Sequence, residues 1–247
     1  MLSATQRRFI RSLHRKRERM AQGMFLAEGP ILVREACDAG WGVERVVATL
    51  DWVPHAALRG VCVEATAEEL ASVSAMESPN QVLAVVRTPA DVPAEAPRGL
   101  ALCLDGVQDP GNLGTILRTA AWFGVERIVC SPACVERFNP KVVQASMGAV
   151  FRVPVHVSPL VPYLRDLPAS VLVAGACLEG ESVYAVRPVE PAVLVLGNEA
   201  HGISPAVLPL VRKRLTIPRI GTGESLNVAI AAAILCSEWR RGGSCLP

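Results

Sequence analysis

The sequence predicts an α/β protein of two domains, and three observations lead to this prediction. Short apolar segments recur along the chain and alternate with helical patterns, which is typical of buried strands covered by helices. The stretch 88–97 is rich in proline, lacks periodicity and is interpreted as a linker. The 247 residues, 51% of them hydrophobic, suffice for two cores of moderate size. We therefore predict an N-terminal domain over residues 1–97, linker included, and a second domain over residues 98–247.

The N-terminal domain is predicted to be a small α/β unit. It opens with a strongly basic helix, and a short strand follows that ends at Gly29. Apolar spacing then predicts two helices and two more strands. These elements are a helix at 31–39, a strand at 43–48, a helix at 67–74 and a strand at 81–86.

The second domain is predicted to hold a parallel sheet with helices on both faces. Two helix starts are marked by an N-cap residue followed by proline, at Asn139-Pro140 and at Ser204-Pro205. On pattern alone, this is an ordinary doubly wound fold. The expected strands are 100–104, 127–130, 153–157, 171–174, 193–196 and 214–217.

Positive charge is concentrated at the N-terminus. The formal net charge is only +2, so the net charge by itself does not indicate a nucleic-acid partner. The N-terminal cluster fits attraction to nucleic-acid phosphates, but on charge alone a solvated helix face explains it equally well. The cluster consists of Arg7, Arg8, Arg11, Arg15, Lys16, Arg17 and Arg19, with Glu18 as the single acidic residue among them.

Cysteine usage and hydropathy bear on the location of the protein. The eight cysteines lack the paired spacing of a metal finger, and several lie in apolar strand-like runs, where a free thiol acts as a small hydrophobe. We expect a reduced, cytoplasmic setting and no metal site. The N-terminus has no apolar signal stretch, and no run approaches the roughly 20 apolar residues that cross a bilayer. The expected protein is soluble and has no membrane partner.

Three strand ends carry clusters of glycine and polar residues. The first cluster, at 106–114, has the sequence GVQDPGNLG; the second, at 197–199, is GNE; the third, at 217–228, is IPRIGTGESLNV. Parallel strands present such clusters to a ligand at the carboxyl edge of their sheet. Together with Arg118, in the helix after the first cluster, they resemble the three motifs of the SpoU/TrmH family of SPOUT methyltransferases. These enzymes transfer a methyl group from S-adenosylmethionine to a ribose 2′-hydroxyl in RNA.

The resemblance implies a fold and a cofactor that periodicity does not reveal. SPOUT domains carry a deep trefoil knot at the carboxyl end of the chain, a rare exception to the rule against threaded chains. S-adenosylmethionine is expected at the knotted loops, against Gly197, Ile217 and Leu226 and the neighbouring Leu196 and Pro218. Gly197 has no side chain, which would let the cofactor approach its backbone. The glycines of the first cluster are not a dinucleotide fingerprint, because the third glycine of that motif is missing.

The resemblance also implies catalytic roles. Asn112 and Arg118 match the first motif, in which the arginine activates the 2′-hydroxyl. Because a guanidinium hardly ever gives up its proton, orienting the hydroxyl and a neighbouring phosphate is the milder role for Arg118. Glu199, Ser225 and Asn227 are the other catalytic candidates, and Glu199 is expected either to fix Arg118 or to bind the substrate.

Structural roles stay open for the same residues. Asn112 and Ser225 could each be only the N-cap of the helix that follows, Arg118 a helix-surface arginine and Glu199 a surface carboxylate. Asn227, expected inside the first helical turn, has weak helix propensity, which points to a task for its side chain.

Three neighbouring residues are assigned no catalytic role. His201 follows the second cluster, but the family pattern puts no catalytic histidine there. Trp122 is expected in the core rather than as a platform for stacking bases. Arg219 departs from the family, in which an apolar residue usually follows Ile-Pro, and is expected at the rim of the cofactor pocket.

Partners follow from the rest of the resemblance. The segment 13–29 is similar to the RNA-binding domain of family members that act on large-subunit rRNA, so rRNA is favoured over tRNA as the substrate. The family implies a homodimer, and the final helix is apolar around more of its circumference than one core-facing stripe requires, although a fully buried helix shows the same pattern. The alternatives are a tRNA 2′-O-methyltransferase, a non-catalytic RNA-binding module with the same fold, and a conventional nucleotide-dependent enzyme that binds NAD or ATP.

Overall fold

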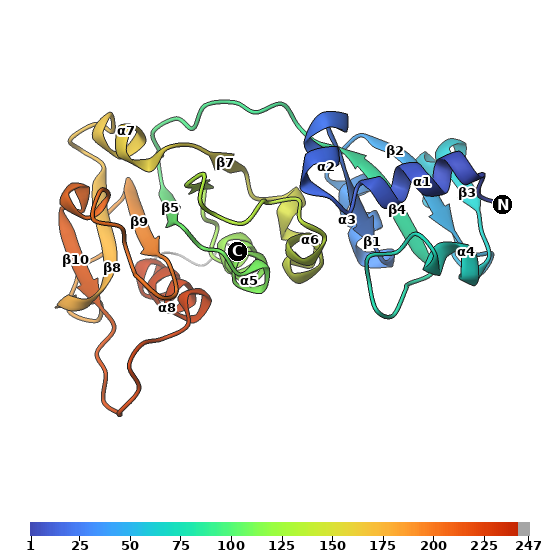
Figure 1. Cartoon of the computed structure of the whole chain (residues 1–247). Helices are drawn as coiled ribbons and strands as arrows, with labels where there is room; N and C mark the ends of the chain where they lie inside the picture. The colour runs from blue at the N-terminus through green and yellow to red at the C-terminus, as the bar shows by residue number, and fades with distance from the viewer. Residues whose placement is uncertain (242–247) are drawn as a thin grey trace. The chain divides into compact units, whose positions relative to one another are not determined.

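A computed structural model describes residues 1–241 of the chain (Figure 1). Contacts divide it into two compact units, which are Met1–Ala90 with Glu136–Arg152, and Asp91–Val135 with the residues from Val153 onward. The chain therefore passes from one unit to the other three times, first inside the predicted linker. The assignment of 1–97 and 98–247 as domains stays a prediction.

The first unit is built on a mixed four-stranded sheet of order β1-β4-β2-β3. The strand β4 pairs antiparallel with both β1 and β2, and β3 pairs parallel with β2. The short β3 and the 3₁₀ helix before it were not predicted. The strands are β1 (Met24–Glu28), β2 (Val43–Ala48), β3 (Cys62–Glu64) and β4 (Val82–Arg87), and the helices include α3 (Pro30–Asp38), α4 (Ala67–Ala71) and η1 (Ala56–Val61).

The basic N-terminal segment forms two helices where one was expected. Ser3 and Gln6 form a capping box that starts α1 (Ala4–Ser12), and α2 (Lys16–Gln22) follows after a short break. The Arg19 guanidinium donates hydrogen bonds to the carbonyl oxygens of Leu13 and His14, each at 2.9 Å. Because those carbonyls are occupied by a side chain, the break between the helices is stabilised.

A segment from far along the sequence completes the core of the first unit. It holds α6 (Pro140–Ser146), which Asn139 caps as predicted, and η2 (Ala149–Phe151). The Phe138 ring stacks on Phe25 of β1 at a centroid distance of 4.3 Å, and Phe151 lies 6.1 Å from the same ring. The fully buried Phe25 therefore gains two aromatic partners from more than a hundred positions away, in addition to the nearby Trp41 at 5.9 Å.

The second unit contains a parallel six-stranded sheet of order β10-β8-β9-β5-β6-β7, which confirms the α/β class and the predicted strands. Helices α5 and α8 pack against each other. The strands are β5 (Leu100–Asp105), β6 (Arg127–Cys130), β7 (Val155–Val157), β8 (Leu172–Ser182), β9 (Ala192–Gly197) and β10 (Lys213–Thr216), and the helices are α5 (Pro110–Trp122), α7 (Leu160–Arg165), η3 (Leu208–Leu210) and α8 (Val228–Arg240).

The helix predicted to start at Ser204-Pro205 is wrong. The Ser204 carbonyl accepts hydrogen bonds from Val207 and Leu208, and the chain makes a turn that leads only into η3. Ile203 and Val207 are buried in the core of this unit, and β10 begins soon afterwards at Lys213. The segment is therefore too short for more than a turn.

The central strands β5 and β9 are apolar and buried, and all six strands end at the same edge of the sheet. The loops after β5, β9 and β10 thus leave from one carboxyl edge. Figure 1 shows the loop between β10 and α8 extending away from the sheet. The seven cysteines within residues 1–241 are free thiols, and Cys245 lies outside the described residues. No helix in that range is both long and apolar enough to cross a membrane.

Replacing Phe138 with alanine should destabilise the first unit by about 3–5 kcal/mol, because it removes a ring stacked in a buried aromatic cluster. Phe138→Leu is the matched control, and since it keeps most of the volume it should cost less than ~1.5 kcal/mol. Urea unfolding measures both free energies. Equal stability of wild type and Phe138→Ala would show that residues 136–152 are not part of this core.

Candidate active site

The loops after β5 and β9 are tied together at the carboxyl edge of the sheet. The two strands run in register up to the pair Asp105 and Gly197. Beyond it, the Asp105 carboxylate accepts a hydrogen bond from the Ser204 amide at 2.8 Å, and the Asn198 side chain donates to the Gly106 carbonyl at 2.7 Å. Sequence reasoning did not single out Asp105 or Asn198, although each directly follows or ends an apolar strand.

Gly197 is required by the fold of its own loop. Asn198 and Gly202 exchange backbone hydrogen bonds of 2.9 and 2.8 Å, which closes a tight turn over the end of β9. A Cβ at Gly197 would lie 2.0 Å from the Gly202 carbonyl carbon and 2.1 Å from the Ile203 nitrogen. The side of Gly197 on which a Cβ would stand is thus filled by this chain. Its contact with the cofactor stays a prediction.

Three predicted polar residues form one hydrogen-bonded series. Asn112 donates through its side-chain amide to the Glu199 carboxylate at 2.8 Å. Asn227 donates to the Asn112 side-chain oxygen at 2.9 Å. The Glu199 carboxylate also accepts long hydrogen bonds from the backbone amides of Gln108, at 3.5 Å, and Asp109, at 3.4 Å. Asn112, Glu199 and Asn227 therefore join the three clusters, and we call them the Asn–Glu–Asn network.

The helix caps differ from those predicted. Asp109, not Asn112, caps α5 by accepting the Asn112 amide at 2.8 Å. Asn227, not Ser225, caps α8, and its side-chain oxygen accepts the amides of the next helical residues at 2.9 and 3.3 Å. Leu226 lies before the helix. The weak helix propensity of Asn227 is thus explained by a double role, since its oxygen caps α8 while its amide nitrogen binds Asn112.

Arg118 and Ser225 lie outside the network. Arg118 is exposed on α5, six residues after Asn112, which is roughly 9 Å along the helix. Among residues 1–241 it has no hydrogen bond or ion pair, so its guanidinium is available to a ligand. Thr115 and Trp122 are exposed on the same stripe of α5, and Trp122 is 85% exposed. The expectation that Trp122 belongs to the core is wrong.

The loop 217–227 fits a ligand with an apolar body and hydrogen-bonding edges. Leu196 is buried, Ile217 is partly buried, and Pro218 and Leu226 are exposed. The backbone amides of residues 221–226 donate no hydrogen bond within the described chain. Arg219 donates to the Gly223 carbonyl at 2.9 Å and so bends back onto the loop. Apolar surface and unengaged amides are what an adenosyl group requires.

One residue of the predicted RNA-binding cluster is not available to bind RNA. Arg19 is only 3% exposed and forms an ion pair with Glu136, so it offers nothing to a phosphate. This is a correction, and its cause is the partly buried carboxylate of Glu136, which lies far away in the sequence. Arg7 is partly exposed, and the fully exposed members are Arg8, Arg11, Arg15, Lys16 and Arg17.

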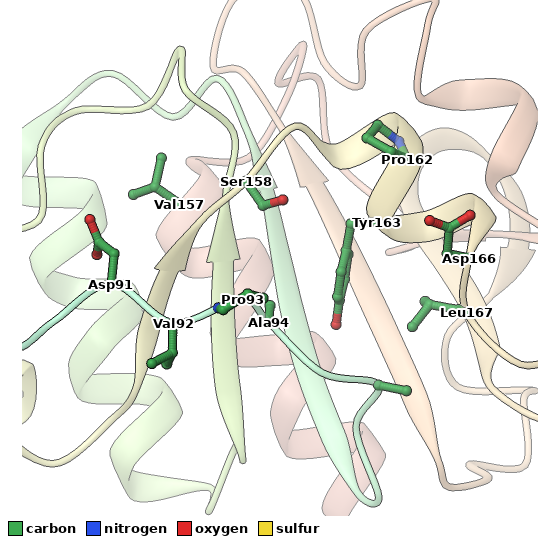
Figure 2. Close-up of a pocket in the computed structure, with 11 residues that line it drawn as sticks. Asp91, Val92, Pro93, Ala94, Val157, Ser158, Pro162, Tyr163, Asp166 and Leu167 are labelled. Carbon is green, nitrogen blue, oxygen red and sulfur yellow. The ribbon is translucent and has the colours of Figure 1, made fainter.

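A separate hollow of about 520 Å³ lies elsewhere in the second unit and contains none of the predicted site residues (Figure 2). Its walls come from the linker around Val92 and Pro93 and from α7, with Tyr163 between them. The Tyr163 hydroxyl donates to the Glu95 carbonyl at 3.3 Å, and burial raises the pKa of this phenol. Within residues 1–241, no group of three or more His, Cys, Asp or Glu side chains is placed to hold a metal ion.

Comparison with known proteins gives matches along both parts of the chain. Residues 99–237 match the SpoU rRNA methylase family, and residues 6–84 match the MRM3-like substrate binding domain. The 23S rRNA (guanosine(2553)-2'-O)-methyltransferase RlmP of Bacillus subtilis (strain 168) is 35% identical over 234 residues, which cover 93% of this chain and 94% of that protein.

Two solved structures share the fold over nearly the whole chain. One, a TrmH-family protein from Porphyromonas gingivalis, is 43% identical at a TM-score of 0.88 and covers 98% of this chain and 100% of its own. The other, the AdoMet-bound rRNA methyltransferase from Sinorhizobium meliloti, is 28% identical at a TM-score of 0.87 and covers 99% of this chain and 98% of its own. With its three motifs joined by the Asn–Glu–Asn network, this chain belongs to the SpoU rRNA methylase family, whose members are S-adenosylmethionine-dependent RNA 2′-O-methyltransferases.

Proposed function

We propose that this protein is a cytoplasmic enzyme that methylates one ribose 2′-hydroxyl in large-subunit, 23S-type rRNA. The Asn–Glu–Asn network carries this proposal, because it joins residues of all three motifs at the edge where a parallel sheet binds its ligands. The choice of RNA is supported by the match to a substrate-binding domain over residues 6–84 and by the similarity to a 23S rRNA methyltransferase.

The chemistry divides between the cofactor and the side chains. S-adenosylmethionine, when bound, supplies an electrophilic methyl group on a sulfonium. Ile217 and Leu226 provide apolar surface for it, and Arg118 binds the acceptor phosphate and orients the 2′-hydroxyl. Because the guanidinium keeps its own proton, Arg118 stabilises the negative charge that develops on the acceptor oxygen while the 2′-hydroxyl proton passes to solvent. In the network, Asn112 is hydrogen-bonded through both its side-chain oxygen and its side-chain nitrogen. This fixes the start of α5 relative to the cofactor loop, and Arg118 lies further along the same helix.

The alternatives fit the structure less well. A non-catalytic RNA-binding module has no need of Asn112, Glu199 and Asn227 joined across all three motifs beside the cofactor loop, whereas an enzyme does. A tRNA substrate is disfavoured by the N-terminal match, since that domain is described as MRM3-like substrate binding. A conventional NAD or ATP enzyme is disfavoured because the family match covers the whole candidate site.

We also infer that two copies of this chain pair through the exposed stripe of α5 and the neighbouring face of α8. Trp122 of α5 is 85% exposed and Ile230 of α8 is 52% exposed, and the two helices pack against each other. Exposed apolar residues on adjacent helices favour a self-complementary two-fold interface. Since Arg118 lies on the same stripe, a second copy that covers Trp122 lies next to Arg118 and shares the site.

Methyl transfer tests the proposed function directly. Tritium from labelled S-adenosylmethionine should enter unmodified 23S rRNA at one position, and alkaline hydrolysis should leave one labelled dinucleotide, because a 2′-O-methyl group blocks cleavage of the next phosphodiester. Bulk tRNA is the control substrate. Label in a base, or in tRNA alone, would refute the assignment.

Arg118→Ala should lower kcat on the order of 100- to 1000-fold, because it removes a donor to the charge that develops in the transition state. Binding of S-adenosylmethionine, measured by calorimetry, should stay within about twofold, since the proposed contacts are with RNA. Arg165→Ala is the matched control, an exposed arginine at the end of α7, and should leave kcat unchanged. A normal rate for Arg118→Ala would end its catalytic assignment.

Trp122→Lys should convert the dimer into a monomer, because it places a charge in the centre of the proposed apolar contact. Leu178→Lys is the matched control, since Leu178 on β8 is 78% exposed but lies outside the α5 and α8 stripe. Sedimentation velocity gives the mass of each variant. A monomeric wild-type protein, or a dimeric Trp122→Lys variant, would contradict this interface.

A further inference from the structure

A short segment after β6 binds the loop that follows β5. We call residues 131–136 the strap. The Ser131 hydroxyl accepts the Gly106 amide at 2.9 Å, and the Cys134 thiol donates to the Leu104 carbonyl at 3.1 Å. The amide of Val135 donates to the Val107 carbonyl at 2.9 Å. The strap therefore follows the β5 loop along its length.

The β5 loop is the part of the site that positions Glu199. Directly after Val107, the amides of Gln108 and Asp109 point to the Glu199 carboxylate. Asp109 also caps α5, the helix that carries Asn112 and Arg118. A movement of the strap at Val135 thus acts on the residues next to the Asn–Glu–Asn network.

The other end of the strap is fixed to the basic helices. Glu136, bonded covalently to Val135, accepts Arg19 in an ion pair and the Phe138 amide at 2.8 Å. The Arg19 guanidinium also holds the carbonyls of Leu13 and His14, so it fixes the junction between α1 and α2. Three exposed cations of the predicted RNA-binding cluster, 15–17, lie at this junction.

We infer that Arg19 and Glu136 are positioning residues that couple RNA binding at the basic helices to the geometry of the methylation site through the strap. This inference rests on the proposed function. Phosphates that bind residues 15–17 order the α1–α2 junction. Because Arg19 joins this junction to Glu136, the position of Glu136 becomes fixed as well. The strap, which begins beside the β5 loop and ends at Glu136, then fixes the β5 loop. This ion pair suits the task, because Arg19 is only 3% exposed and the loss of Glu136 would leave its charge without a partner.

The decisive variant lengthens the strap without removing any side chain. Insertion of two glycines between Val135 and Glu136 keeps the contacts within each unit. It adds flexible backbone between them, so the position of Glu136 no longer determines the position of the strap. The same insertion between Ala90 and Asp91, another passage between the units, is the matched control. Thermal melting and S-adenosylmethionine binding confirm that both proteins fold, and unmodified 23S rRNA is the RNA probe.

The strap insertion should lower kcat at saturating RNA about 10- to 100-fold while the Kd for RNA stays within about twofold, because only the geometry of the reacting groups changes. The linker insertion should leave both quantities near wild type. Arg15→Ala should instead weaken RNA binding and reduce the salt slope by about one, because it removes a phosphate contact that the strap insertion leaves in place. Glu136→Gln keeps a hydrogen-bond acceptor for Arg19, so its kcat should lie between those of the wild type and the strap insertion.

Hydrogen exchange separates this inference from the proposed function. RNA binding should slow exchange at the amides of 106–112 in wild type and in the linker insertion, but not in the strap insertion. If wild type methylates no RNA yet shows this protection, the proposed function fails and the coupling stands. Equal protection and equal kcat in the two insertion variants would overturn the coupling.

Discussion

The close approach of the backbone to Gly197 is the constraint on which the site depends. The turn at 198–202 folds back over the end of β9, and a Cβ at Gly197 would overlap it at 2.0 Å. This turn directs Asn198 towards the β5 loop and Glu199 towards Asn112. Membership of the SpoU family implies a deep trefoil knot in this part of the chain. The glycine itself is required by the local turn, because the backbone of Gly202 and Ile203 occupies the place of a Cβ.

The site shows how one polar side chain can serve stability and chemistry together. Asn227 uses its oxygen for the first amides of α8 and its nitrogen for Asn112, so no polar atom of its side chain is left without a partner. Asn112 is likewise bonded through both side-chain atoms. A polar network that is fully satisfied holds one arrangement, whereas removal of one member leaves partners unpaired. Arg118, left free beside this network, can bind the acceptor with little rearrangement of the chain.

Much of this architecture could be predicted from the sequence. The central strands β5 and β9 were found because parallel strands buried on both faces are apolar throughout, and Asn139-Pro140 marked a true helix start. The errors concern features decided by distant residues. Arg19 looked like a free cation because its partner Glu136 lies 117 positions away, and Trp122 looked like core because an exposed tryptophan is uncommon. The resemblance to the family motifs identified Asn112, Glu199 and Asn227 as site residues. No local sequence pattern could predict the hydrogen bonds between them, because they lie in three separate segments of the chain.

The three passages of the chain between its units also set an order of events during synthesis. Met1–Ala90 leaves the ribosome first, but Phe25 meets Phe138 and Phe151 only after the chain has been made as far as Arg152. By then the strands β5 and β6 of the other unit have already emerged. Domains usually complete themselves in sequence order. Here part of the aromatic core of the amino-terminal unit stays uncovered until β5 and β6 of the other unit have been translated.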